Sequence, residues 1–267
     1  MLETVLKKHE EGDVYTSSWL KSQGINTRLQ HYYRKTKKLQ YLGDKLKMSE
    51  LNMIFPADID LMKYRVLTKY SEAPKTEGII KAIQYQMQLN IHIGADHALQ
   101  RLGYRIAYPL RPFRMVLFGN GNQRLPKWVS LNSTGCSDII YKKTSFLPQN
   151  VEILKLNGLM TSSPLRAIFE LIYLVPNYVY STEAFDYMKL LTDLNAKSVQ
   201  HMLENCESYR VKRIFLFLAE KAGHQWFGDL CFDRIDLGKG TRLIELPGIH
   251  EPKYKIIISP ILINKTA

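Results

Sequence analysis

The stretch from Tyr15 to Lys47 reads YTSSWLKSQGINTRLQHYYRKTKKLQYLGDKLK, and it decides the fold of the N-terminal part of the chain. Hydroxyl side chains precede its first short apolar run, and such side chains cap the first turn of a helix. Gly24 then turns the chain, and Asn26 or Thr27 offers a cap for a second helix, which we expect to run to about Leu39. The pattern predicts two short helices around a glycine turn.

The second predicted helix separates into two faces when its residues are spaced at about 100°. Its apolar side is expected to hold Ile25, Leu29, Tyr32, Tyr33, Thr36 and Leu39. Its polar side gathers Thr27, Gln30, His31, Arg34, Lys35 and Lys38, with Arg28 and Lys37 at the flanks. From Lys21 to Lys38 the chain has six Lys or Arg and no acidic residue. A face that only solubilises a helix normally mixes both signs of charge. The pattern therefore favours a DNA-binding face over its alternative, a solvated basic face.

In a helix-turn-helix, amide, imidazole and guanidinium groups of the second helix meet base edges, while ammonium groups reach phosphates. We predict a DNA-facing surface composed of Thr27, Arg28, Gln30, His31, Arg34, Lys35 and Lys38. At the N-terminus of the first helix, we expect the hydroxyls of Thr16, Ser17 and Ser18 to contact phosphate. Downstream, residues 41–47 can form a hairpin wing that adds Lys45 and Lys47 to the phosphate contacts.

The charge of the whole chain points the same way. Its 267 residues carry a formal net charge of +12, and the sequence pI is about 9.4. Residues 1–48 hold ten Lys or Arg against five Asp or Glu, so this segment supplies five of the twelve excess charges. A local basic excess indicates a polyanionic partner, of which double-stranded DNA is the first candidate. There is no apolar run of 18 residues and no leader pattern, so we expect no membrane partner and a cytoplasmic protein.

The cysteines and histidines suggest neither disulfides nor metal. Cys136, Cys206 and Cys231 are odd in number and far apart, which fits a reducing compartment. His92 and His97 are five residues apart and have no paired cysteines near them, so they lack the spacing of metal ligands. We expect no metal site and no other cofactor.

Motifs of catalysis are equally incomplete. The segment Gly238–Thr241 reads GKGT, but a phosphate-binding loop needs a glycine where Asp233 stands and a helix where a strand is expected. Glu152 and Lys155 have the wrong spacing for a restriction-type nuclease, and nothing marks a nucleophile elbow. We therefore predict a protein that is not an enzyme and has no catalytic residues.

The periodicity of the rest of the chain predicts an α+β fold. An N-terminal winged helix-turn-helix domain is expected over residues 1–48, a linker or irregular insertion over 49–75, and a larger mixed α/β C-terminal domain over 76–267. Within the last we expect a helix from 76, a helix through 98 and 102, and a small, largely antiparallel sheet that includes a hairpin turn at Asn157-Gly158. Further helices are expected at 165–174, 182–194, 197–206 and 209–221, followed by strands at 242–246 and 254–259.

Several phrases, taken in order, resemble a known family. They are Tyr15–Leu20 with Gly24-Ile25, Leu89–Gly94, Ala98-Leu99 with Leu102–Tyr104, Leu125–Trp128, Ser163-Pro164 with Arg166-Ala167 and Glu170-Leu171, Val211–Leu216 with Leu218–Glu220, Trp226, Leu237–Gly240 and Lys253-Tyr254. Together they resemble the AbiEi antitoxins, the antitoxin and regulator half of type IV toxin-antitoxin systems linked to abortive phage infection. The family's glycine and aromatic wing is replaced here by Lys45-Leu46-Lys47 and an atypical insertion.

The resemblance implies a protein that represses its own operon through the N-terminal domain. It also implies that the C-terminal domain neutralises a cognate nucleotidyltransferase toxin, without necessarily forming a stable complex. We expect Lys212 and Arg213 to be exposed beside the buried positions Val211, Ile214 and Phe215, and to form part of the neutralising surface; the alternative is a solvated start to a core helix. Two rival functions are a plain transcriptional regulator with a ligand- or partner-binding C-terminal domain, and a DNA-processing enzyme.

Overall fold

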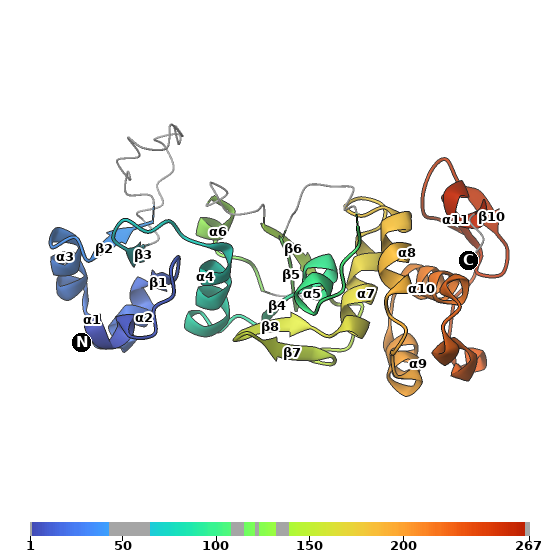
Figure 1. The fold of residues 1–267 in the computed structure, drawn as a ribbon, viewed down its shortest axis with the longest axis horizontal. Coiled ribbons are helices and arrows are strands. Elements are labelled where there is room, and N and C mark those ends of the chain that lie inside the picture. The colour runs from blue at the N-terminus through green and yellow to red at the C-terminus, as the bar shows by residue number, and fades with distance from the viewer. Residues whose placement is uncertain (1, 43–64, 108–114, 121–122, 132–138, 265–267) are drawn as a thin grey trace. The chain divides into compact units, whose positions relative to one another are not determined.

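The structure of the protein is a computed structural model that describes residues 2–42, 65–107, 115–120, 123–131 and 139–264. Helices and strands are mixed along the chain, so the fold is α+β, as predicted (Figure 1). The chain divides into two compact units, one of residues 1–91 and 122–141 and one of residues 92–121 and 142–267. We call them the N-terminal and C-terminal units. In the part of the chain that the structure describes, no helix has the length and apolar character to cross a membrane.

The N-terminal unit joins short helices to a three-stranded sheet. Its elements are α1 (Leu2–Leu6), β1 (Val14–Thr16), α2 (Ser17–Ser22), α3 (Thr27–Lys35), β2 (Leu39–Tyr41), β3 (Val66–Lys69), α4 (Thr76–Lys81), the π-helix η2 (Ala82–Gln86) and α6 (Lys127–Leu131). The strand order is β1-β3-β2, and β3 is antiparallel to both neighbours. A small core of Leu2, Tyr15, Leu20, Ile25, Leu39 and Leu67 joins the sheet to the first three helices.

Side-chain caps start α2 and α3 where the sequence predicted them. The hydroxyl of Thr16 accepts a hydrogen bond from Trp19 N, and Asn26 Oδ1 accepts one from Leu29 N. Gly24 has a φ of 84°, so the turn between the helices uses a conformation that favours glycine.

The end of α3 was predicted wrongly. The helix stops at Lys35, and Lys37 takes a positive φ of 52°, so the chain does not continue to Leu39 as a helix. Leu39 instead begins β2, where it pairs with Lys69 and is buried. Pairing with a distant strand overrides the helical periodicity that the sequence shows locally.

β3 lies inside the segment that the sequence marked as a linker. Because β3 is the central strand of the sheet, the N-terminal unit includes residues well beyond residue 48. α4 and η2 also belong to this unit. Lys45 and Lys47, the predicted wing contacts, lie outside the described residues.

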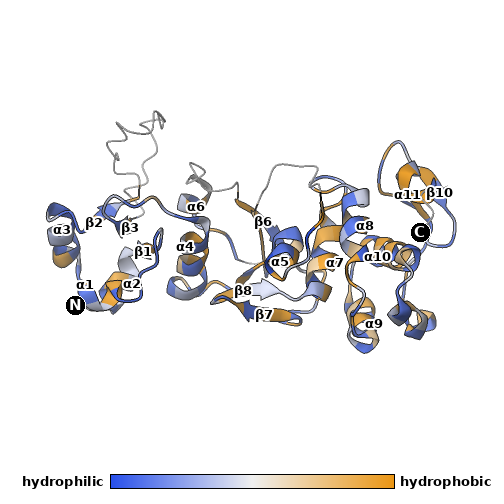
Figure 2. Cartoon of the chain, viewed as in Figure 1, coloured by the Kyte–Doolittle hydropathy of each residue, from blue (hydrophilic) through white to orange (hydrophobic). Residues whose placement is uncertain are grey.

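The C-terminal unit has its core between a mixed sheet and a set of helices. The five-stranded sheet has the order β6-β5-β4-β8-β7, with β4 (Ile91–Ile93), β5 (Met115–Gly119), β6 (Ile139–Lys143), β7 (Ile153–Leu156) and β8 (Leu159–Ser162). Two of the boundaries between the units fall within β4 and β6. The helices are α5 (Ala95–Arg101), α7 (Pro164–Leu174), α8 (Ser181–Lys189), α9 (Ala196–Asn205), α10 (Tyr209–Ala222), the 3-10 turns η3 (Gln225–Asp229) and η4 (Phe232–Arg234), and α11 (Pro260–Asn264). A second sheet has the order β10-β11-β9, from β9 (Arg242–Leu243), β10 (Ile249–Glu251) and β11 (Ile256–Ile258). Apolar residues dominate α7 (Figure 2), which packs against α5, α8 and α10.

The larger sheet confirms the predicted hairpin and also contains a parallel pair of strands. Asn157 and Gly158 both have positive φ, at 47° and 78°, and they join β7 to β8 in antiparallel register. β4, however, pairs with β8 in parallel. A parallel pair needs a long connection, and the residues between these two strands supply it, which no local pattern can indicate.

A buried ionic network ties α7 to this sheet. Glu170 is fully buried and accepts hydrogen bonds from His92 Nε2 at 2.7 Å, Ser162 Oγ at 2.7 Å and Arg166 Nε at 2.9 Å. Gly94 leaves the space for it, since a Cβ there would lie 2.2 Å from Glu170 Oε2. Burial by itself would raise the pKa of Glu170, but the charges and hydrogen bonds of His92, Arg166 and Ser162 outweigh it and lower that pKa.

Replacing Glu170 with alanine should destabilise the protein strongly, because buried Arg166 loses its counter-charge. We expect a loss of about 3–5 kcal/mol in the free energy of unfolding, measured by urea unfolding with far-UV circular dichroism. As a control, Glu207→Ala removes an exposed carboxylate and should change the free energy of unfolding by less than about 0.5 kcal/mol. Equal midpoints for the two variants would contradict the assignment. In the unaltered protein, the lowered pKa means that this stabilisation is present above the unfolded-state pKa and is lost as pH falls through the folded-state pKa.

Candidate nucleic-acid interface

One side of α3 is exposed and basic. Its exposed residues are Thr27, Arg28, His31, Tyr32 and Lys35, which we call the α3 surface. They are spaced three to four residues apart in two adjoining rows, so they share one face of the helix. Arg28 and Lys35 form no ion pair with any described residue, and neither does Lys38 just beyond the helix. The positive charge of this face is therefore available to a partner.

Gln30 does not belong to that surface, which corrects its predicted role. Its side chain is 1% exposed. Gln30 Nε2 donates to Ile25 O at 2.8 Å and to Ser17 O at 3.2 Å, and Gln30 Oε1 accepts from Ser17 Oγ at 2.7 Å. The amide thus fixes α3 against α2 and against the turn between them. A buried glutamine is stable here because each contact satisfies a polar group that would otherwise be buried alone.

The predicted hydroxyl contacts also divide between two roles. Ser17 is buried and donates to Gln30, while Thr16 is buried and caps α2. Ser18 alone of the three is exposed, although its hydroxyl also donates to Thr16 Oγ1 at 3.3 Å. The first turn of α2 therefore uses most of its hydroxyls to hold its own structure, which leaves Ser18 as the accessible one.

Arg34 was predicted on the polar side of the helix and Tyr32 on the apolar side, but the structure places each in the opposite environment. Arg34 is half-buried, and its guanidinium carbon lies 3.8 Å from the centre of the Tyr41 ring, so it packs α3 onto β2. Tyr32 was expected on the apolar side but is 56% exposed. The face available to a ligand therefore combines cations with one aromatic ring.

Lys212 and Arg213 are buried, so their predicted exposure is wrong. The guanidinium of Arg213 donates to four carbonyl oxygens, those of Leu237, Gly238, Gly240 and Lys255, at 2.6–3.0 Å. An arginine has five N–H donors in a planar fork, and these carbonyls converge on it from two segments of the chain. The GKGT segment is thus a turn, as the positive φ of its two glycines also indicates. Arg213 attaches this turn to α10.

Lys212 is 3% exposed and lies over the Tyr209 ring, with Nζ 5.0 Å from the ring centre. Because Lys212 and Arg213 are both buried, a partner protein cannot contact them, and we do not assign them to toxin neutralisation. The residues that the structure describes include no group of three or more His, Cys, Asp or Glu side chains placed to hold a metal ion.

Comparison with known proteins identifies the family. A family model described as "Transcriptional regulator, AbiEi antitoxin, Type IV TA system" matches residues 113–259, more than half of the chain. The protein therefore belongs to the AbiEi family of antitoxins and transcriptional regulators of type IV toxin-antitoxin systems.

A solved structure with a similar fold is that of the RV2827C protein from Mycobacterium tuberculosis. It has 12% sequence identity and a TM-score of 0.59, and the match covers 97% of this chain and 89% of that one. At this identity the similarity is one of fold alone. No curated protein matches the sequence.

Replacing Gln30 with alanine should loosen the two helices that present the α3 surface. The change leaves the carbonyls of Ser17 and Ile25 without their donor, which costs about 1–3 kcal/mol of local stability. Hydrogen exchange of the amides in residues 20–36 should then become faster. The control is Gln23→Ala, which shortens an exposed glutamine of the same unit. Unchanged exchange in the Gln30 variant would contradict its role.

Proposed function

We propose that the N-terminal unit is a winged helix-turn-helix domain, and that the protein represses its own operon by binding double-stranded operator DNA. The observation that carries this proposal is the α3 surface, a basic and acid-free face on the second of two helices locked together by Gln30. A helix held in this way can lie in the major groove with its exposed residues against base edges.

The strands after α3 fit the same proposal. β2 follows the helix closely and forms an antiparallel pair with β3, and Arg34 joins the helix to β2 through Tyr41. In winged domains such a pair lies beside the recognition helix and contacts the DNA backbone. We propose that Lys45 and Lys47 add to these phosphate contacts. On this proposal the protein acts in the cytoplasm, where its operator DNA lies.

We further propose that the C-terminal unit counteracts a nucleotidyltransferase toxin encoded in the same operon, with or without a stable complex. The family match supports this half of the proposal, since it lies mainly in the C-terminal unit and its description names an antitoxin. The alternative is a plain winged-helix regulator whose C-terminal unit binds a ligand or another partner.

The double variant Arg28→Ala, Lys35→Ala should bind a duplex of its own promoter about 30-fold more weakly than the unaltered protein. Each side chain supplies about 1 kcal/mol through base or phosphate contacts. The slope of log K against log salt should become shallower by about 0.9 for each phosphate that the variant no longer neutralises. Fluorescence anisotropy at several salt concentrations measures both quantities.

The matched control is Lys7→Ala, Lys75→Ala, which removes the same charge from exposed positions elsewhere in the N-terminal unit. It should leave both the affinity and the salt slope nearly unchanged. If the two double variants are weakened equally, binding depends on total charge and the α3 surface is not the interface.

The two activities should separate in the full-length chain. Expressed from a foreign promoter with the cognate toxin, the variant Arg28→Ala, Lys35→Ala should rescue growth as well as the unaltered protein does. On a reporter fused to the native promoter, the same variant should no longer repress. Loss of rescue at equal protein levels would contradict the division of labour. Failure of the unaltered protein to rescue would reject the antitoxin role and favour the plain regulator.

A further inference from the structure

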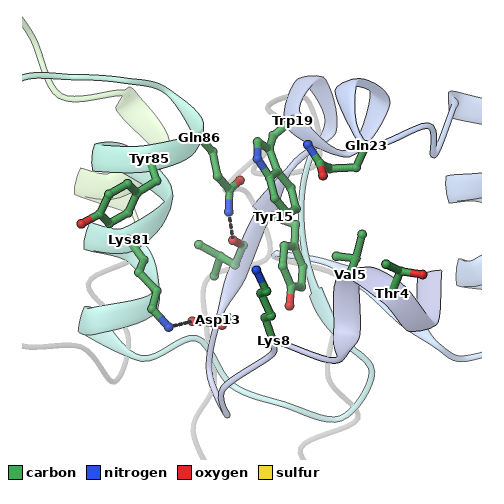
Figure 3. Close-up of a pocket in the computed structure, with 11 residues that line it drawn as sticks. Thr4, Val5, Lys8, Asp13, Tyr15, Trp19, Gln23, Lys81, Tyr85 and Gln86 are labelled. Atoms are coloured by element: carbon green, nitrogen blue, oxygen red, sulfur yellow. Dashed lines mark hydrogen bonds and ion pairs between the residues drawn. The ribbon is translucent and has the colours of Figure 1, made fainter. Parts of the chain in front are cut away.

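The N-terminal unit contains a cavity of about 530 Å³ beside α2 (Figure 3). One side is built from the segment that precedes α2 and from α2 itself, and the other from the end of α4 and η2. The volume falls in the range of about 300–1,000 Å³ that is typical of small-molecule sites. No part of the proposed DNA interface uses this space.

The two sides of the cavity are held at a fixed separation. Gln86 Nε2 donates to Val14 O at 2.7 Å, and Gln86 Oε1 accepts from Thr16 N at 2.7 Å, so the amide pairs with β1 as a strand residue would. Lys81 Nζ contacts Asp13 Oδ1 at 3.2 Å. The walls are therefore formed before any ligand arrives, which reduces the entropy cost of binding.

Stacked aromatic rings line the side of the cavity that β1 and α2 build. Tyr15 and Trp19 stack with their ring centres 5.7 Å apart and their planes 12° from parallel. Trp19 is half-buried, whereas Trp128 and Trp226 are buried. Tyr85 lies on the opposite side and is 42% exposed, and its ring is turned away from Trp19 (Figure 3). The flat, half-buried ring of Trp19, stacked on Tyr15, favours a planar aromatic ligand.

One cation in the lining has no counter-charge. Lys81 is neutralised by Asp13 and by Glu10, with which it forms ion pairs. Lys8 reaches the same space from the segment after α1 (Figure 3) and pairs with no acidic residue in the described part of the chain. An ammonium group beside aromatic walls attracts an anionic group.

We propose that this cavity binds a small planar aromatic anion, with its ring against Trp19 and its anionic group on Lys8. The anion has two chemical sources, the phosphate of a mononucleotide and the carboxylate of an aromatic acid. Both present the same combination of a flat ring and a negative charge. The proposal does not depend on DNA binding, because the residues that carry it lie outside the α3 surface.

Isothermal titration calorimetry on the full chain, without DNA, tests the site. The probes are 5′-AMP and salicylate, each paired with its uncharged counterpart, adenosine or salicylamide. We expect one of the two anions to bind with a Kd below about 1 mM and its neutral counterpart to bind about tenfold more weakly. The arm that binds identifies the source of the anion. Absence of binding by both anions at this concentration would overturn the proposal.

Three variants separate a specific site from general charge attraction. Lys8→Ala should weaken binding of the anion about tenfold and leave its neutral counterpart unaffected. Lys7→Ala, the neighbouring exposed lysine outside the lining, should change neither. Trp19→Leu removes the ring and should weaken binding of the anion and of its neutral counterpart alike, with far-UV circular dichroism confirming that the variant is folded. Equal effects of the two lysine variants would reject Lys8 as the anion contact and, with it, the site.

Discussion

The geometry of the N-terminal unit depends on one buried amide. Gln30 satisfies the hydroxyl and carbonyl of Ser17 and the carbonyl of Ile25, so it fixes how far α3 is rotated about its own axis. Because successive residues of a helix are about 100° apart, fixing one of them decides the direction of all the others. With Gln30 turned inward, the residues of the α3 surface turn outward. The basic face is thus set by a neutral side chain that points the opposite way.

The C-terminal unit uses buried polar groups for a similar purpose. Glu170 holds α7 to β4 and β8, and Arg213 holds the turn at Gly238–Gly240 and the chain at Lys255 to α10. Several of the phrases by which the sequence resembles the AbiEi family contain these residues or the segments that they join. Such phrases therefore mark packing, and a surface that counteracts a toxin has to be sought among other residues.

Local chemistry made much of the fold predictable. The caps at Thr16 and Asn26, and the turn at Asn157-Gly158, act within a few residues, and each lies where the sequence placed it. Predictions failed where a distant partner decides the outcome. The end of α3 depends on pairing with β3, and the burial of Gln30 depends on Ser17 in the preceding helix.

The candidate site shows the same division between local and distant causes. Periodicity placed Arg28, His31 and Lys35 on an exposed face, but it could not distinguish them from Gln30, which is equally polar. A neutral amide among cations was the one available signal, because an amide can satisfy both a donor and an acceptor in a buried position. Arg213 gave no such signal, since an arginine near the start of a helix is usually solvated.

Site-specific photo-crosslinking tests the central claim, that the α3 surface lies against operator DNA, most directly. Tyr32, an exposed ring of that surface, is replaced by p-benzoylphenylalanine, and Tyr180, a comparably exposed ring of the C-terminal unit, serves as the reference position. Irradiation with a duplex of the protein's own promoter should yield a covalent protein-DNA product from position 32 and none from position 180. A product from position 180, with none from position 32, would contradict the account.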